Sequence, residues 1–323
     1  MTTSSDRPVL LIGDNVWGRH GSVISSFAPD MEVLVYEGED PLPQDVLDRI
    51  TIAFFSQDLW PERSRGFVLS VMGAKNLQWF HTFSAGVDSP FFIDLMKRGV
   101  RLTNSSGATA SPIAQTAILY MLALSRNVRA WFQHQEKHEW QRHNIVELDG
   151  AHLAVIGMGP IGEEIARLGV ALNMNVEAIR RTATGKEPCP TFGFDQLNSV
   201  LGRADWVAVA LPLADETRNI FDKDRFTQMK KGAHFINIGR GELVDEPALI
   251  AALQSGHLAG AALDVFATEP LPSDSPLWDM PNVIVTPHSS GASPKAGLRS
   301  EALFVANLQK FLNNESLVNE VRL

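Results

Sequence analysis

The sequence predicts an α/β protein built from two domains, each a mostly parallel sheet with helices on both faces. Two observations support this fold class. Short apolar runs alternate with segments of helical periodicity, and after a long helical stretch the alternation restarts at Gly150. The chain also has 323 residues, which exceeds one typical domain and suffices for two domains that each bury a core.

The strand-like runs are rich in β-branched and aromatic residues, and turn residues separate them. The first hundred residues hold PVLLIG (8–13), MEVLVYE (31–37), TIAFFS (51–56), LQWFHTF (77–83) and VRLTNSS (100–106). The second part holds HLAVIG (152–157), NVEAIR (175–180), WVAVALP (206–212), AHFINIG (233–239), GAALDVF (260–266) and NVIVTPH (282–288). Helical segments lie between the runs, so each sheet should be parallel.

Two further segments have helical periodicity. Residues 108–140 are apolar on more than one face and are predicted to form one long helical connection between the domains. Residues 293–321 could return to pack on the first domain. We therefore expect a discontinuous first domain, residues 1–103 with 292–323, and a second domain, residues 104–291.

Composition excludes several classes of function. A net charge of −9 disfavours nucleic acid and anionic membranes as partners. The start, MTTSSDRPVLLIGD, lacks the features of a secretory signal, and no apolar stretch reaches the roughly 20 residues of a membrane span. The single cysteine, Cys189, cannot form an intrachain disulfide, which suits a cytoplasmic protein. No metal site is expected.

A glycine motif follows the first strand run of the second domain. Gly157, Gly159 and Gly162 form G-x-G-x-x-G between the strand HLAVI and the helical run PIGEEIARLGVAL. This spacing lets backbone amides approach a pyrophosphate at a helix N-terminus, so it predicts dinucleotide binding; the alternative is a turn that only packs the helix. The similar GDNVWG lacks the middle glycine, so Gly13 and Gly18 are interpreted as ordinary turn residues.

Two arginines stand where an NAD-binding protein usually has an acidic residue for the ribose 2′-hydroxyl. Arg180 and Arg181, followed by Thr182, end the strand run NVEAI. Guanidinium groups bind a 2′-phosphate and a carboxylate would repel it, so NADP(H) is the cofactor this site predicts over NAD(H). The alternative is a solvated basic strand end.

Three polar side chains follow later strand runs of the same domain: Arg240, Glu269 and His288. Each alone is more often structural than catalytic. Together they form a constellation, because the carboxyl ends of strands in a doubly wound sheet meet at one edge.

These segments resemble the D-isomer-specific 2-hydroxyacid dehydrogenase family over nearly the whole chain. The resemblance is densest in LDGAHLAVIGMGPIG, ALPLADETRNIF, GAHFINIGRGELVDEPAL, LAGAALDVFATEPLP and LWDMPNVIVTPH. It implies two Rossmann-like domains, a flavodoxin-like substrate domain and a dinucleotide-binding domain, around an interdomain cleft. It also implies a homodimer.

The resemblance assigns roles to the three polar residues. A 2-keto acid carries a carboxylate, and its carbonyl becomes an alkoxide as hydride arrives, so it requires a cation and a proton. Arg240 would anchor and polarise the substrate, His288 would be the acid and base, and Glu269 would orient His288. Asp264 would hold the nicotinamide carboxamide.

The remaining binding residues follow from the same motifs. The cofactor set is Gly157, Met158, Gly159, Pro160, Ile161, Gly162, Arg180, Arg181, Thr182, Leu211, Pro212, Thr217, Ile238, Gly239, Asp264, His288 and Ser290. The substrate set is Phe54, Gln57, Ala85, Gly86, Val87, Arg240 and His288. Ala85, Gly86 and Val87 lie in FSAGVD, which resembles the family's carboxylate-binding loop. Phe54 and Gln57 lie in FFSQ, similar to the F-x-x-Q pattern of an NADPH-using subgroup, although core plus turn explains it equally well.

One departure from the family concerns the long helix, where Ile113, Ala114 and Gln115 replace the V-A-E of many relatives. No function is assigned to Gln115.

The sequence favours an NADPH-dependent reductase that converts small 2-keto acids to D-2-hydroxy acids. A glyoxylate or hydroxypyruvate reductase differs from it only in the pocket and stays open. An NAD-dependent formate oxidiser conflicts with the arginine pair, and a dinucleotide-sensing regulatory protein would not need all three polar residues.

Overall fold

The computed structural model describes residues 7–322. They fold into two compact units: the first runs to Thr109 and resumes at Ser293, and the second is Ala110–Ala292. The first unit thus extends six residues beyond the predicted boundary at residue 103, because residues 104–109 are bonded to it. Arg299 Nε, for example, donates to Ala108 O over 2.7 Å.

The start of the chain, on which the expectation of no secretory signal rests, includes residues 1–6, which lie outside the described residues. Among residues 7–322, no helix is long and apolar enough to cross a membrane.

The first unit has a sheet with strand order β13-β5-β4-β3-β1-β2, and only β13 is antiparallel to its neighbour. Its strands are β1 (Val9–Gly13), β2 (Glu32–Tyr36), β3 (Ile52–Phe55), β4 (Trp79–Thr82), β5 (Arg101–Thr103) and β13 (Glu320–Val321). Its helices are α1 (Asp14–Phe27), α2 (Gln44–Leu47), α3 (Ser64–Gly73), α4 (Pro90–Lys97) and α11 (Pro294–Leu312). The order of its parallel strands is flavodoxin-like.

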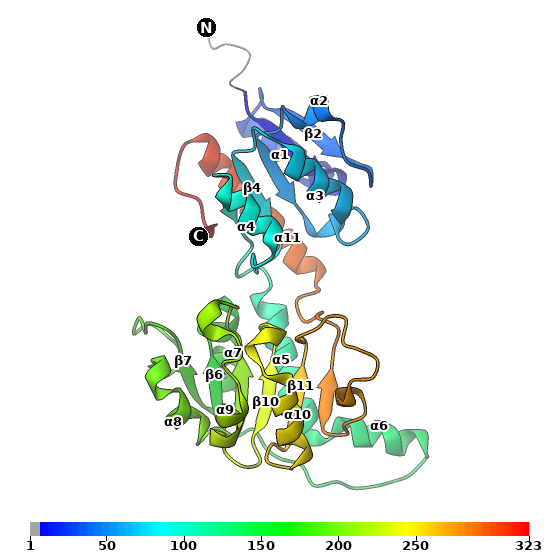
Figure 1. Ribbon diagram of the computed structural model, residues 1–323, viewed down its shortest axis with the longest axis vertical. Helices are drawn as coiled ribbons and strands as arrows, with labels where there is room; N and C mark the ends of the chain where they lie inside the picture. Colours follow the sequence, from blue (N-terminus) through cyan, green and yellow to red (C-terminus); the bar gives the residue numbers. More distant parts are fainter. Residues whose placement is uncertain (1–6, 323) are drawn as a thin grey trace. The chain divides into compact units, whose positions relative to one another are not determined.

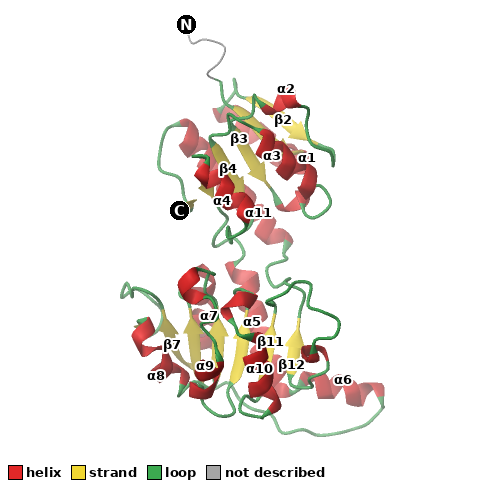
Figure 2. Ribbon diagram, in the orientation of Figure 1, coloured by secondary structure: helices red, strands yellow, loops and turns green. Residues whose placement is uncertain are grey.

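Helices flank the sheet of each unit (Figure 2). Alternate side chains of the first sheet pack on opposite layers of helices. Leu11, Phe55 and Phe80 belong to a core with α2, α3 and α4. Leu10 and Phe54 belong to a core with α1 and α11. Helix α11 therefore packs on the sheet of the first unit, although about 190 residues separate it from β5 (Figure 1).

The second unit has an all-parallel sheet of order β12-β11-β10-β9-β6-β7-β8. Its strands are β6 (His152–Ile156), β7 (Asn175–Ile179), β8 (Thr191–Phe192), β9 (Trp206–Val209), β10 (His234–Asn237), β11 (Gly260–Leu263) and β12 (Val283–Val285). Its helices are α5 (Ala110–Arg126), α6 (Val128–Glu136), α7 (Pro160–Ala171), α8 (Leu197–Leu201), α9 (Lys223–Gln228) and α10 (Glu246–Gln254). Leu153 and Val155 pack with α5 and α7, and Ala154 and Ile156 pack with α8, α9 and α10. The order is that of a Rossmann fold, so the predicted α/β class is confirmed.

The long helical segment differs from its prediction. Residues 108–140 form two helices, α5 and α6, which are separated at Asn127. Asn127 has a φ of +50°, a left-handed conformation that ends a helix and that asparagine tolerates better than most residues.

Candidate active site

The glycine turn connects β6 to α7 where the strand order reverses, between β6 and β9. Gly157 has a φ of +106°, and a Cβ there would lie 2.7 Å from Ala210 O. A Cβ on Gly162 would lie 1.8 Å from Gly157 O. Glycine is therefore required at both positions for the turn to close.

Gly159 differs from these two glycines, because a Cβ there would meet nothing within 4 Å. The turn is thus open on this side. Gly159 is also the N-cap of α7, has no side-chain cap, and is followed by Pro160 in the first turn. Met158 and Ile161 pack into the core and hold the turn. Uncapped helix amides beside an open glycine fit a pyrophosphate.

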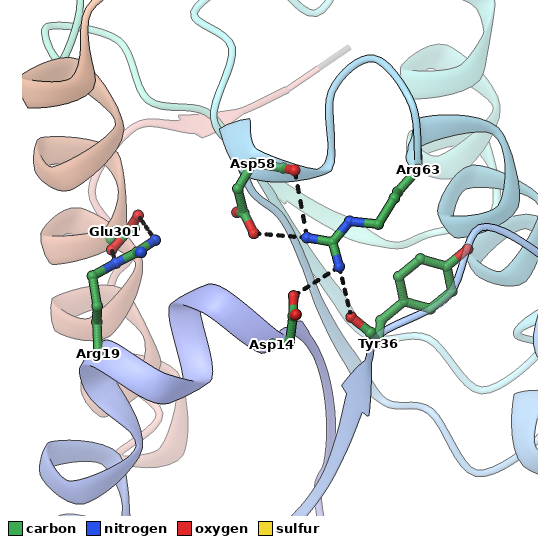
Figure 3. A network of polar contacts seen from close by, with 6 residues as sticks. All are labelled: Asp14, Arg19, Tyr36, Asp58, Arg63 and Glu301. Atoms are coloured by element: carbon green, nitrogen blue, oxygen red, sulfur yellow. Dashed lines mark hydrogen bonds and ion pairs between the residues drawn. The ribbon is translucent and has the colours of Figure 1, made fainter.

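The corresponding turn in the first unit is closed by charged side chains (Figure 3). Arg63 donates to Asp14, which follows β1, over 2.7 Å and to Asp58, which follows β3, over 3.1 Å. The hydrogen bond from Arg63 keeps the pKa of Asp14 below its usual value. The position where this sheet reverses its strand order is therefore used for an internal ion network, which supports the interpretation of Gly13 as an ordinary turn residue.

The two arginines after β7 have different surroundings. Arg180 Nη1 donates to Glu187 Oε1 over 2.7 Å, and the Glu187 side chain is only 3% exposed. The amide and hydroxyl of Thr184 bond the same oxygen, and these bonds together with Arg180 lower the pKa of Glu187 to about 2. Arg181 is 80% exposed and pairs with Glu216, which is 61% exposed.

The loops after β9 and β10 pack against each other. A Cβ on Gly239 would lie 2.8 Å from Leu211 O, and Ile238 is buried beside this contact. The Thr217 hydroxyl donates to Pro212 O over 3.0 Å and accepts from the Ala214 amide over 2.8 Å. Thr217 thereby shapes the loop, and any contact with a cofactor stays a prediction.

His288 follows β12, and Glu269 follows the neighbouring strand β11. His288 Nδ1 lies 2.8 Å from Glu269 Oε2, and Glu269 Oε1 accepts from the Phe266 amide over 3.0 Å. The side chains are 49% and 37% exposed, so both are open to a ligand. The expected pair is thus within hydrogen-bond distance.

Asp264 holds the backbone around His288. Its side chain is fully buried. One carboxylate oxygen accepts from the Thr286 hydroxyl over 2.6 Å and the Ser289 amide over 3.0 Å, and the other accepts from the Ser290 amide over 3.0 Å. The His288 amide donates to Asp264 O over 2.8 Å, which stabilises the left-handed φ of +49° at His288.

Both oxygens of Asp264 are thus used within the protein. These bonds assign Asp264 to holding the loop. Oδ2 accepts one amide, that of Ser290, and a carboxylate oxygen has two lone pairs, so the contact with a nicotinamide carboxamide that the resemblance implied stays a prediction.

Sequence reasoning missed Tyr120 on α5. Because the Thr286 hydroxyl donates to Asp264, it must accept from the Tyr120 hydroxyl, to which it is hydrogen-bonded. Burial raises the pKa of Tyr120 to about 12, so the phenol stays a donor. A tyrosine in the apolar run AILYMLALS carries no local sign of this role.

Arg240 begins the loop after β10. The Asn237 side chain bonds both the Arg240 carbonyl, over 2.9 Å, and the Gly239 amide, over 3.1 Å, and so fixes the turn. A Cβ on Gly241 would lie 1.8 Å from the carbonyl carbon of Phe266, so the loops carrying Arg240 and Glu269 touch. Arg240 Nη1 donates to Gly239 O over 2.9 Å.

The predicted substrate residues of the first unit differ in how exposed they are. Phe54 is fully buried and stacks on Phe304 with centroids 4.3 Å apart, which favours the core alternative for this residue. Gln57 begins a short 3-10 helix, and its amide lies beside Gly297 of α11. The loop with Ala85, Gly86 and Val87 follows β4 and is partly exposed.

Gln115, to which no function was assigned, is exposed on α5, and its side chain donates to the Ser111 hydroxyl.

A family model described as D-isomer specific 2-hydroxyacid dehydrogenase, NAD binding domain, matches residues 118–290. The chain belongs to this family. Glyoxylate/hydroxypyruvate reductase B of Enterobacter sp. (strain 638) is 37% identical over 241 residues, which cover 72% of this chain and 74% of that protein.

One further relative is longer than this chain, and one solved structure of a relative contains a cofactor. D-3-phosphoglycerate dehydrogenase of Methanocaldococcus jannaschii is 32% identical over 255 residues, 77% of this chain, and the match spans only 48% of that longer protein. The solved structure of an NADPH-dependent glyoxylate/hydroxypyruvate reductase from Sinorhizobium meliloti, in complex with NADP and sulfate, aligns with a TM-score of 0.76 and 27% identity over 98% of each chain. The family and its relatives support a nicotinamide dinucleotide as the cofactor.

Proposed function

We propose that this protein reduces small 2-keto acids to D-2-hydroxy acids with NADPH. The hydrogen bond between His288 Nδ1 and Glu269 Oε2 carries this proposal, because it provides an oriented proton donor and acceptor. The pair lies on loops after β11 and β12 in the same sheet as the glycine turn.

The histidine provides the proton. A carboxylate only accepts hydrogen bonds, so Nδ1 donates to ionised Glu269 and Nε2 is the nitrogen left to exchange a proton. A bound NADPH would supply the hydride that reduces the carbonyl carbon. His288 protonates the carbonyl oxygen as negative charge develops, and in the oxidation of a hydroxy acid neutral His288 accepts that proton.

Arg240 and the loop 85–87 hold the substrate in this proposal. The Arg240 guanidinium stabilises the developing alkoxide and binds the carboxylate. The amides of Ala85, Gly86 and Val87 bind the same carboxylate.

The preference for NADPH rests on an arginine whose charge is accessible. Arg180 is engaged by Glu187, a shielded carboxylate with three donors on one oxygen. The exposed pair of Arg181 and Glu216 is of a kind that contributes only about 0–1 kcal/mol, so Arg181 can exchange its partner for a 2′-phosphate. We therefore assign the 2′-phosphate to Arg181, and we assign Arg180 to ordering residues 180–187.

Binding of adenosine 2′,5′-bisphosphate and of adenosine 5′-monophosphate, measured by calorimetry, tests this assignment without turnover. Arg181→Gln should weaken the bisphosphate by roughly tenfold or more and leave the monophosphate unchanged. In Arg181→Gln/Glu187→Gln, release of Arg180 should restore part of the loss. If Arg180→Gln alone removes the discrimination, the assignment is reversed.

The reaction itself is tested by following NADPH oxidation with glyoxylate, hydroxypyruvate and longer aliphatic 2-keto acids. Chiral chromatography is applied to the products of hydroxypyruvate and the longer acids, because the product of glyoxylate is achiral. A D-product supports the proposal, and an L-product contradicts it. The Enterobacter and Sinorhizobium relatives favour glyoxylate and hydroxypyruvate as the first substrates to try. No turnover with any acid, together with tight NADPH binding, would favour the dinucleotide-sensing alternative.

We also propose that two copies associate through α5, α6 and the segment that follows. Several large apolar side chains in this region are exposed: Leu119 (60%), Trp131 (45%), Phe132 (60%) and Trp140 (96%). Light scattering should give a dimer for the wild type and a shift to monomer for Phe132→Glu; a wild-type monomer at micromolar concentration contradicts the proposal. The cytoplasmic location stays a prediction.

A further inference from the structure

Three successive carbonyl groups in the loop after β4 are bonded to the protein. Ser84 O accepts from the Ser105 amide over 3.0 Å, Ala85 O accepts from Asn104 Nδ2 over 2.7 Å, and Gly86 O accepts from the Ser84 hydroxyl over 2.9 Å. The side chain of Val87 packs on the core and anchors the far end.

The amide groups of this loop, in contrast to its carbonyl groups, are not hydrogen-bonded within the described part of the chain. Among the described residues, no protein acceptor is bonded to the amides of Ala85, Gly86 or Val87. A peptide group directs its N–H opposite to its C=O, so fixing the carbonyls also fixes the direction of the amides. Three fixed, unsatisfied amides make a site for an anion.

Asn104 is the side chain that reaches this loop from another strand. Its Oδ1 accepts from the Ser106 amide over 3.1 Å, and its Nδ2 donates to Ala85 O. A flipped amide would place donor against donor and acceptor against acceptor, so the orientation is determined by the two partners.

Asn319, next to β13, holds Asn104 in turn. Its Nδ2 donates to Ser106 O over 2.9 Å and to Asn104 O over 3.4 Å, and its carbonyl accepts from the Asn104 amide over 3.2 Å. Pairing of β13 with β5 and the ion pair of Arg101 with Glu320 keep this segment in place.

We propose that Asn104, fixed by Asn319, is a positioning residue: by holding Ala85 O it aims the Gly86 amide, the middle one of the three, at the carboxylate of the 2-keto acid. This inference rests on the proposed function. The segment around β13 then influences substrate affinity, because the Asn319 side chain holds Asn104 and the Asn104 side chain holds the loop.

Steady-state kinetics of Asn104→Ala and Asn319→Ala test the proposal. Asn76→Ala is a matched control, because Asn76 makes the same kind of bond to a carbonyl, Asp48 O, elsewhere in the first unit. The KM for the 2-keto acid should rise about tenfold in Asn104→Ala and less in Asn319→Ala, with kcat within about threefold and the Kd for NADPH unchanged. Asn76→Ala should leave KM unchanged.

Calorimetry with oxamate, a carboxylate analogue of the substrate, gives a readout without turnover. Its affinity for the NADPH-loaded protein should fall in parallel with the rise in KM. A KM and oxamate affinity of Asn104→Ala within twofold of the wild type overturn the proposal, as does a loss confined to kcat. If the wild type itself neither turns over a 2-keto acid nor binds oxamate, the proposed function has failed, and the inference fails with it.

Discussion

His288 Nδ1 lies 2.8 Å from Glu269 Oε2, and this bond joins the loops that follow two neighbouring parallel strands. The pair is open to ligand, whereas the Asp264 carboxylate that holds its backbone is fully buried. The proposed acid and base is thus exposed and has a rigid support, as proton transfer at a fixed position requires.

Replacement of His288 by Gln should lower kcat by about 10²- to 10⁴-fold, because the general acid is lost. Affinity for NADPH should stay within about threefold, since the glycine turn is unchanged. Stopped-flow single turnovers and calorimetry measure the two effects. His257→Gln, at a ring bonded to Met229 O and far from β12 in the sequence, is the control and should keep full activity. Near-normal turnover of His288→Gln would end its assignment as the acid.

Replacement of Glu269 by Gln should lower kcat by roughly 10- to 100-fold, because a charge-assisted hydrogen bond to the imidazole becomes a neutral one. The amide would also present donors to Nδ1 and favour the tautomer with the proton on Nε2. The melting temperature should change little, as the glutamate is part-exposed. A kcat equal to that of the wild type would show that Glu269 does not orient His288.

Alanine should have different effects on stability at Gly162 and at Gly159. Gly162→Ala should lower the melting temperature, because its Cβ would overlap Gly157 O. Gly159→Ala should leave the melting temperature unchanged or slightly higher, since its Cβ meets no protein atom and alanine restricts the unfolded chain. It should still weaken NADPH, by about tenfold or more, if the pyrophosphate lies there. Unchanged NADPH affinity in a stable Gly159→Ala protein would place the cofactor elsewhere.

His81 should make the protein less stable in acid. Burial lowers the pKa of His81 to about 3, below the value of about 6.5 expected in the unfolded chain. Between these values the unfolded chain binds a proton that the folded one does not. The contribution is therefore fully present above pH 6.5 and is lost as the pH falls toward 3. His81→Gln, which does not titrate, should show a shallower loss of stability over this window in denaturant titrations. Parallel pH dependences would contradict the assignment.

Local patterns predicted most of the fold. Every strand longer than two residues coincides with a predicted apolar run, and the glycine turn lies where its spacing placed it. The sequence did not indicate β8 and β13, which have two residues each and exist only by pairing with a longer strand at a sheet edge. The break at Asn127 depends on one left-handed residue within an otherwise helical pattern.

The candidate residues of the site could be named from the sequence, and the hydrogen-bond network that joins them could not. Glu269 and His288 were paired through the family resemblance, and Arg180 and Arg181 were indistinguishable as neighbours in the sequence. The two arginines differ in the structure because Arg180 pairs with Glu187 and Arg181 pairs with Glu216, and these two glutamates lie on different loops. The bonds from Tyr120 through Thr286 to Asp264 link residues far apart in the chain, so no short motif indicates them.

The most direct test of the central claim is the initial rate of the purified protein with a small 2-keto acid, compared between NADPH and NADH at equal concentrations. We expect rapid oxidation of NADPH, at least tenfold faster than that of NADH at subsaturating cofactor, and a D-2-hydroxy acid as product. Equal or faster rates with NADH would show that the arginines do not select the cofactor. No oxidation of either cofactor by any 2-keto acid would contradict the reductase function itself.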